Sequence, residues 1–262
     1  MNKPLLGLSG GINSMAVLCW LIEQYNRPND ICIFYAHFKE HSPDTFQFVA
    51  DGIRLARKHF NVHVKITSNS IIDYFASEKF IPHPKVSPCS EHLKFEIAEK
   101  WAFEMGCDVD LIGYVKHELK RRTQKAKGNA KNKFEQTKMF EAVKQYPIGE
   151  FTDEWCFNIV HKYIGWYPKI YDILYTIDDY NNNLCQKWQI GKRVFLHNNC
   201  LPCKNMDNNG IANVKRYYPE YYYKAMQLSA YLGSYWGRDE DDFYFRFGRD
   251  LGQDSTCEKC KW

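Results

Sequence analysis

The residues best placed to do chemistry lie near the start of the chain, where two glycines are flanked by serines. Ser9, Gly10 and Gly11 follow a short apolar run, and Ser14 comes three residues later, where helical spacing begins. Glycines let backbone N–H groups approach a phosphate, and a helix N-terminus adds donors and a positive dipole end. The pattern predicts an anion-binding loop before a helix that starts near Asn13 or Ser14. The alternative is a glycine-rich turn that binds nothing.

Four cysteines in two Cys-x-x-Cys pairs form a second candidate site. One pair is Cys200 and Cys203, and the other is Cys257 and Cys260. Each pair can direct two thiolates at one ion, and two pairs complete a tetrahedral four-sulfur site, whereas the alternative is two unrelated thiol pairs. Zinc and a [4Fe-4S] cluster suit four thiolates equally, so the metal stays open. The six other cysteines are scattered and are interpreted as ordinary buried thiols.

The order of apolar and periodic segments predicts the scaffold that positions these residues. Apolar runs typical of buried strands occur at 5–8, 30–36 and 109–113, and residues 62–66 alternate between apolar and polar as in a strand. Helical periodicity separates them, as at 45–59, so the fold class is α/β: a Rossmann-like parallel sheet with helices on both faces. Such sheets bind ligands at the carboxyl edge of their strands, where His37 and Gly113 follow two of the runs.

Composition and charge distribution set the broad class and the expected domains. The chain has 262 residues, 45% of them hydrophobic, without a membrane-spanning run or a signal peptide, so we expect a cytoplasmic globular protein. A nucleotide-binding domain is expected over 1–175, followed by an aromatic-rich region with the cysteine site over 176–262. Between Lys120 and Lys138, eight basic residues stand against one acidic residue. This segment could track a nucleic-acid backbone, cover a ligand as a lid, or be a solvated loop.

Several segments resemble, in order, those of the PP-loop ATP pyrophosphatases and their phosphoadenosine phosphosulfate (PAPS) reductase relatives. Ser9-Gly-Gly-Ile-Asn-Ser14 is similar to the PP-loop Ser-Gly-Gly-x-Asp-Ser, except that Asn13 can cap a helix but carries no charge. The segments that resemble PAPS reductase motifs are Pro43-Asp44-Thr45, Cys89-Ser-x-x-Leu93-Lys94, Gly113-x-x-x-x-Glu118 with Arg121 and Arg122, Tyr146-Pro-Ile, Phe151-Thr-Asp-Glu-Trp155 and Pro168-x-x-Tyr171-Asp172. These matches span about residues 5–172.

The resemblance implies an adenine-nucleotide site that holds ATP with Mg²⁺. It also implies an enzyme that adenylates an acceptor with release of pyrophosphate, a transferase or ligase in nucleic-acid or sulfur modification. The implied nucleotide-binding residues are Ser9, Gly10, Gly11, Asn13, Ser14, His37, Gly113 and Glu118. The implied catalytic cations are Lys94, Lys116, Arg121 and Arg122. Expected partners are the nucleotide, nucleic acid through Lys120–Lys138 and a second copy of the chain, but no membrane.

Two other functions remain open. A sulfonucleotide (PAPS) reductase is the first, but the chain ends Cys257-Glu-Lys-Cys-Lys-Trp262 and lacks the Glu-Cys-Gly-x-His motif of those enzymes. The second is a nucleotide- or nucleic-acid-binding module that has lost catalysis, which the uncharged Asn13 would favour. Pyrophosphate release from ATP and sulfite release from PAPS distinguish the three functions.

Overall fold

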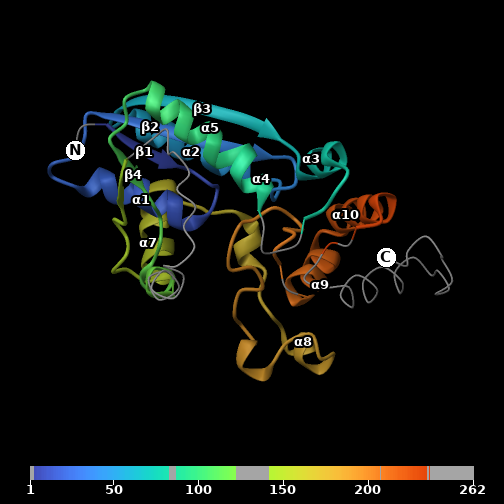
Figure 1. Cartoon of the computed structure of the whole chain (residues 1–262). Helices are drawn as coiled ribbons and strands as arrows, with labels where there is room; N and C mark the ends of the chain where they lie inside the picture. Colours follow the sequence, from blue (N-terminus) through green and yellow to red (C-terminus); the bar gives the residue numbers. More distant parts are fainter. Residues whose placement is uncertain (1–2, 83–86, 122–141, 207, 235, 237–262) are drawn as a thin grey trace. The chain divides into compact units, whose positions relative to one another are not determined.

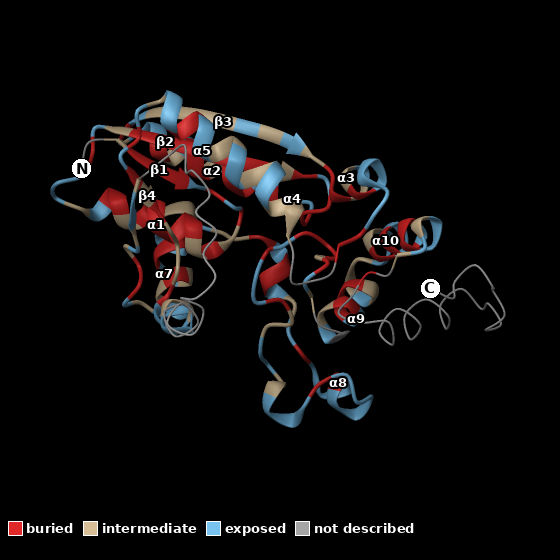
Figure 2. Cartoon of the chain, in the orientation of Figure 1, coloured by how far each residue is buried: buried red, intermediate tan, exposed pale blue. Residues whose placement is uncertain are grey.

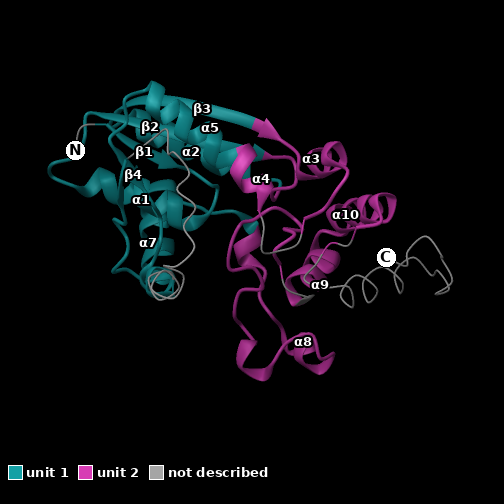
Figure 3. Ribbon diagram, in the orientation of Figure 1, with its two compact units in different colours: residues 1–37, 43–67, 94–169 teal, residues 38–42, 68–93, 170–262 magenta. Residues whose placement is uncertain are grey.

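The computed structural model describes residues 3–82, 87–121, 142–206, 208–234 and 236. The chain separates into two compact units: residues 1–37, 43–67 and 94–169 form unit 1, and residues 38–42, 68–93 and 170–262 form unit 2 (Figure 3). The boundary expected at residue 175 differs from this division, because segments 38–42 and 68–93 group with the C-terminal part. The main chain shows one reason, since the N–H of Leu201 donates to the carbonyl oxygen of Glu40 at 2.8 Å.

A five-stranded parallel sheet forms the centre of unit 1, in the strand order β3-β2-β1-β4-β5 (Figure 1). Its strands are β1 Pro4–Gly7, β2 Asp30–Phe38, β3 Asn61–Asn69, β4 Val109–Leu111 and β5 Val143–Gln145. Strand β1 pairs in parallel with β2 and with β4, and β4 pairs in parallel with β5. Residues 31–36 of β2 are all buried, as expected for a strand covered on both faces.

Helices cover both faces of this sheet. Helices α1 Ile12–Glu23, α2 Thr45–Arg57 and α7 Asp153–Ile164 pack against one another. The return from β3 to β4 crosses the sheet in the opposite direction, so the right-handed crossover rule places α5 Glu96–Glu104 on the other face. Figure 2 shows the buried residues concentrated in the sheet and α1. The Rossmann-like α/β fold expected from the sequence is thereby confirmed.

Close packing between α1 and α2 fixes where α1 lies. Met15 is fully buried, and its side chain lies over Gly52 of α2. A Cβ atom at Gly52 would lie 2.5 Å from the Cε of Met15, so the glycine leaves the space that the methionine occupies.

Two details of unit 1 differ from the sequence predictions. Helix α1 begins at Ile12, earlier than predicted, and its N-cap Gly11 makes no side-chain capping hydrogen bond. The prediction that Asn13 caps this helix is therefore wrong, because its amide instead contacts Glu118. Strand β5 was not predicted, because its three residues directly follow the basic segment and are too short for a periodic signal.

A helix predicted from residue 89 to about residue 105 is present, with an irregular turn. The α4 turn Pro88–Ser90 leads into the π-helical turn Glu91–Phe95, and α5 follows directly. Thr152 is the N-cap of α7, and its Oγ1 accepts a hydrogen bond from the N–H of Trp155 at 3.3 Å.

Unit 2 is mostly helical. Helix α10 Pro219–Leu232 packs against α9 Asn208–Tyr217 and against α3 Ile71–Glu78. The buried carboxylate of Glu40 accepts hydrogen bonds from the Ser70 hydroxyl at 2.5 Å and from the Ile71 N–H at 3.0 Å, which anchors the start of α3. Across residues 3–82, 87–121, 142–206, 208–234 and 236, no helix has both the length and the apolar character needed to cross a bilayer.

Candidate functional site

The glycine-rich loop lies where the strand order of the sheet reverses direction. Strand β1 has β2 on one side and β4 on the other, so the connections after β1 and β4 diverge at their carboxyl ends. Open α/β sheets bind ligands at this point. A Cβ atom at Gly113, just past β4, would lie 3.0 Å from the carbonyl oxygen of Asn13 and 3.2 Å from the nitrogen of Ser14. Glycine therefore allows the connection after β4 to touch the start of α1.

Hydrogen bonds between the two serines shape the loop after β1. Their hydroxyl oxygens lie 3.1 Å apart, and Ser14 Oγ also accepts from the Ser9 N–H at 3.1 Å and donates to the Gly11 carbonyl oxygen at 3.0 Å. Gly10 adopts a φ of +82°, and a Cβ atom there would lie 2.3 Å from the Cγ2 of Thr45. Any other residue at this position would be strained and would also clash with the start of α2. The loop is thus held in a turn that backbone N–H groups can use to bind an anion.

A carboxylate lies beside this loop, and Glu118 supplies it. The Asn13 side-chain amide donates to Glu118 Oε2 at 3.2 Å, and the Val115 N–H donates to the same oxygen at 3.3 Å. Both Asn13 and Glu118 are half-buried. An aspartate at position 13 would bring two carboxylates to hydrogen-bonding distance, where like charges repel. The departure from the PP-loop pattern at Asn13 is therefore matched by an acid at position 118.

The structure assigns a location to three of the four predicted cations. Lys116 is exposed, and its backbone N–H donates to the Phe151 carbonyl oxygen at 3.1 Å, which joins two of the motif segments. Arg121 is exposed, and Lys94 is half-buried in the π-helical turn. Arg122 lies outside the described residues, as does most of the basic segment. Their roles on phosphates stay predictions, although π-helical turns occur frequently at functional sites.

Two further motif segments come into contact within unit 1. The carboxylate of Asp44 accepts a hydrogen bond from the Lys169 N–H at 2.7 Å, so the segment that begins α2 contacts the one that begins at Pro168. Asp51 of α2 accepts from the indole N–H of Trp166 at 3.0 Å. These contacts give the ordered sequence matches a common structural setting.

The two histidines after the second predicted strand have different environments. His37 still belongs to β2, and its Nδ1 lies 3.0 Å from the hydroxyl of Tyr35. Its ring meets the ring of Phe46 edge-on at 5.2 Å. His41 is 4% exposed and lies against Phe38, with the ring centroids 5.4 Å apart. A role for His37 at the nucleotide stays a prediction.

One aromatic pair near the loop, Tyr114 and Tyr146, was not predicted from the sequence. Tyr114 follows Gly113 directly, and its ring stacks on Tyr146 with a centroid distance of 5.8 Å and an interplanar angle of 18°. Tyr146 was noted only as part of one motif, and Tyr114 only as a variable position of another. Tyr114 lies just after a predicted strand, but Tyr146 follows β5, which the sequence did not reveal, so the pair left no complete signal.

Only one of the two cysteine pairs lies in the described residues. Cys200 is buried and Cys203 half-buried, whereas Cys257 and Cys260 fall outside the described range. Among the described residues, no three or more His, Cys, Asp or Glu side chains are grouped so that they could hold a metal ion. The four-cysteine site therefore stays a prediction.

A buried lysine joins this pair to a third cysteine that the sequence did not single out. Lys204 is 2% exposed, and burial lowers its pKa, an effect opposed by the nearby thiols of Cys89 and Cys203. The amide of Asn205 donates to the Ser87 hydroxyl at 3.0 Å, which holds the two segments together. Cys89 is half-buried, so it is not one of the ordinary buried thiols that the sequence indicated.

No protein-family model matches the sequence, and no curated protein is significantly similar to it. Among solved structures, the fold is similar to "U34-tRNA thiolase NcsA from Methanococcus maripaludis with its [4Fe-4S] cluster". The TM-score is 0.47 and the sequence identity 14%, over 100% of this chain and 80% of that chain.

Proposed function

We propose that unit 1 binds ATP with Mg²⁺ and transfers its adenylyl group to an acceptor, with release of pyrophosphate. The acceptor oxygen would attack the α-phosphorus, and the bond between the α- and β-phosphates would break. The adenylated oxygen then becomes a leaving group for a nitrogen or sulfur nucleophile, as nucleic-acid or sulfur modification requires. The observation that carries this proposal is the serine-bridged glycine loop, placed at the switch point of the sheet with Glu118 beside it.

Each residue of the loop has a stated part in this proposal. Ser9, Gly10, Gly11 and Ser14 hold the phosphates through backbone N–H groups and hydroxyls, and the N-terminus of α1 adds its positive dipole end. Lys94, Lys116, Arg121 and Arg122 neutralise the phosphate charge that develops on pyrophosphate. His37 and Gly113 lie at the same strand edge. The mechanism relies on positioning and electrostatic stabilisation, as phosphoryl-type transfers generally do.

Glu118 takes over the part that an aspartate at position 13 would play near a metal-bound pyrophosphate. Mg²⁺ prefers carboxylate and phosphate oxygens, and one carboxylate is enough when the phosphates supply further ligands. Asn13 holds Glu118 in place through its amide without adding a second negative charge. On this basis the loss of charge at position 13 does not remove catalysis.

The proposal also includes a structural metal site at the cysteines of unit 2, here called the metal clip. Cys200 and Cys203 would supply two thiolates, and Cys257 and Cys260 the others, to zinc or to a [4Fe-4S] cluster. The buried ammonium of Lys204 fits such a centre, because a nearby cation stabilises thiolates, the form in which cysteine binds metal. Cys89 is a further candidate ligand, since its side chain interacts electrostatically with the same Lys204.

Pyrophosphate release tests the proposal directly. Purified protein with ATP and Mg²⁺ is assayed for pyrophosphate with and without RNA or protein fractions as acceptors, and ATP binding is measured by calorimetry. Ser14→Ala should weaken ATP binding at least about tenfold, because the loss of a charge-assisted hydrogen bond costs about 1.5–3 kcal/mol. Ser68→Ala is the matched control, since Ser68 is an exposed serine at the far edge strand β3.

Three outcomes decide between the functions. Pyrophosphate release that requires Ser14 supports the proposal. Sulfite release from PAPS with a thiol donor would assign the chain to sulfonucleotide reduction instead. ATP binding without any turnover would leave a nucleotide-binding module. An absorption spectrum with iron and zinc analysis, on anaerobically purified wild-type protein and on Cys200→Ala, tests the metal clip separately.

A further inference from the structure

We propose that residues 173–197 of unit 2, here called the arm, form a docking surface for single-stranded nucleic acid. In Figure 1 the chain runs out to α8 Ile177–Asn181 and returns beside itself. This inference rests on the arm alone and goes beyond the proposed nucleotide chemistry of unit 1.

Main-chain hydrogen bonds give the base of the arm a defined shape. The Tyr175 N–H donates to the Lys192 carbonyl oxygen at 2.9 Å, and the Val194 N–H donates to the Ile173 carbonyl oxygen at 2.8 Å. Between these two bonds, Leu174 and Arg193 form an antiparallel bridge. A 3₁₀ turn, Lys187–Gln189, lies on the returning side.

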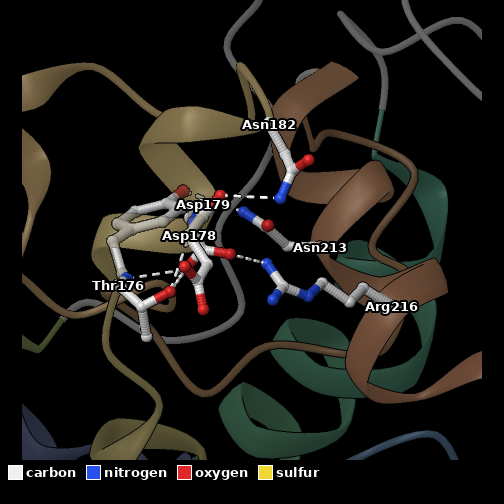
Figure 4. A network of polar contacts seen from close by, with 7 residues as sticks. Thr176, Asp178, Asp179, Asn182, Asn213 and Arg216 are labelled. Atoms are coloured by element: carbon white, nitrogen blue, oxygen red, sulfur yellow. Dashed lines mark hydrogen bonds and ion pairs between the residues drawn. The ribbon is translucent and has the colours of Figure 1, made fainter.

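Buried polar contacts fix the arm to helix α9 (Figure 4). Asp179 is fully buried, accepts hydrogen bonds from the backbone N–H and hydroxyl of Thr176, and pairs with Arg216. The Asn213 amide donates to the hydroxyl of Tyr175 at 2.9 Å. Side chains on the arm are therefore presented on a supported scaffold.

The arm carries an unusual exposed aromatic side chain with a cation beside it. Trp188 is 67% exposed, and the ammonium of Lys192 lies 4.5 Å from its ring centroid. Trp is highly buried on average, and an indole that reaches solvent offers a flat apolar ring and an N–H to a partner. Other exposed apolar side chains of the arm are Ile177, Leu184 and Leu196.

Charge identifies the class of that partner. The outgoing side of the arm carries Asp178 and Asp179, the second of which is paired with Arg216. The returning side, from residue 180 to residue 197, contains no Asp or Glu and carries Lys187, Lys192 and Arg193. A polyanion complements this stretch, and single-stranded nucleic acid adds bases that can stack on the free face area of Trp188. Stacking on an aromatic ring contributes about 1–3 kcal/mol per base and tolerates any sequence. In a duplex the bases are already stacked, so the arm should favour unpaired strands.

Binding of labelled RNA to the full chain tests the arm. A mixed-sequence RNA of about 20 nucleotides and a hairpin of the same composition are titrated by fluorescence anisotropy at several salt concentrations. Trp188→Ala should weaken binding of the single strand about 5- to 100-fold. Lys187→Gln with Lys192→Gln should lower the slope of log affinity against log salt by about 1.4, since each phosphate contact to a single strand contributes about 0.7.

Matched variants in unit 1 serve as controls. Tyr25→Ala removes a fully exposed aromatic ring, and Lys58→Gln with Lys100→Gln removes two exposed charges. These controls should bind RNA like the wild type. Equal affinity and salt slope for the arm variants and the wild type would overturn the proposal, and so would the absence of any RNA binding. Equal binding of hairpin and single strand, insensitive to Trp188→Ala, would also overturn it.

The test also separates the arm from the proposed enzyme. ATP binding and pyrophosphate release without nucleic acid should be unchanged in the arm variants. If ATP chemistry fails but the arm variants still lose RNA affinity, the arm proposal stands while the proposed function falls. Circular dichroism at matched temperatures shows whether Trp188→Ala folds, and Trp188→Phe should restore much of the affinity because it keeps a stacking ring.

Discussion

Replacing Asn13 with aspartate should convert a hydrogen bond into a repulsion. In the structure Asn13 Nδ2 lies 3.2 Å from Glu118 Oε2. Two unit charges at that separation repel by about 1.3 kcal/mol in water and by about 5 kcal/mol at an effective dielectric of 20. Both side chains are half-buried and can rotate apart, and a hydrogen bond worth about 1 kcal/mol is also lost. We expect Asn13→Asp to lower the free energy of unfolding by about 2–3 kcal/mol at pH 7.

The pH dependence of this loss has a definite sign. A second carboxylate beside Glu118 raises the pKa of the introduced carboxyl in the folded state above its unfolded value of about 3.9. The deficit is therefore fully present at neutral pH and disappears as the pH falls below about 4, where the introduced group is protonated in both states. Urea unfolding of the wild type and Asn13→Asp at pH 7 and pH 4 measures this difference.

The charge-swapped double variant completes the test. Asn13→Asp combined with Glu118→Gln moves the carboxylate to position 13 and lets the introduced amide donate to it, so stability should return to within about 1 kcal/mol of the wild type. Under the proposed function, Mg²⁺-dependent ATP binding should fall in Glu118→Gln and recover in the double variant. The reasoning is refuted if Asn13→Asp is as stable as the wild type at pH 7, or if the double variant is no better than Asn13→Asp.

Further predictions concern the switch point and unit 2. Gly113→Ala should lower the free energy of unfolding by about 1–3 kcal/mol, because the added Cβ would lie 3.0 Å from a carbonyl oxygen of α1. Gly7→Ala should lower it less, because a Cβ at Gly7 meets no atom within 4 Å, and thermal unfolding compares the two variants. Burial alone would raise the pKa of Asp179, but hydrogen bonds from Thr176 and the pairing with Arg216 lower this pKa overall. The contribution of Asp179 to stability is therefore present above a pH of about 4 and is lost as the pH falls through the lowered pKa. Arg216→Gln should lower the free energy of unfolding at pH 7 by about 1–3 kcal/mol and should lose less stability than the wild type between pH 7 and pH 3, as urea unfolding at the two pH values would show. A difference from the wild type that is equal at both pH values would contradict this.

The sheet and its site loop could be predicted because their signals are local. Apolar runs and one alternating segment predicted four of the five strands. The adjacent glycines after β1 predicted the position of the loop, which lies at the switch point of the sheet. The contact between Asn13 and Glu118 could not be predicted, because it joins positions 105 residues apart through a register set by β1 and β4. Helix capping was a reasonable local use of the asparagine, but a carboxylate from a distant segment competes successfully for its amide.

The grouping of the chain into units also lay beyond the sequence. Segments 38–42 and 68–93 follow two strands of the sheet and look like ordinary connections, but Glu40 is buried in unit 2 and holds the start of α3. Long-range main-chain pairing of this kind leaves no periodic signal. The environment of Cys89 could not be predicted for the same reason, since Lys204, with which it interacts, lies 115 positions later.

The packing of Met15 over Gly52 restricts which substitutions the core can accept next to the glycine-rich loop after β1. Met15 directly follows Ser14, so any enlargement at Gly52 pushes on the turn of α1 that carries the loop's hydroxyl. A flexible methionine can yield to a small change, but a rigid β-branched residue cannot. Positions 15 and 52 should therefore vary as a pair among related chains, one small and the other large. Laboratory selection for nucleotide affinity would then recover compensating changes at these two buried positions, neither of which is itself proposed to bind a phosphate.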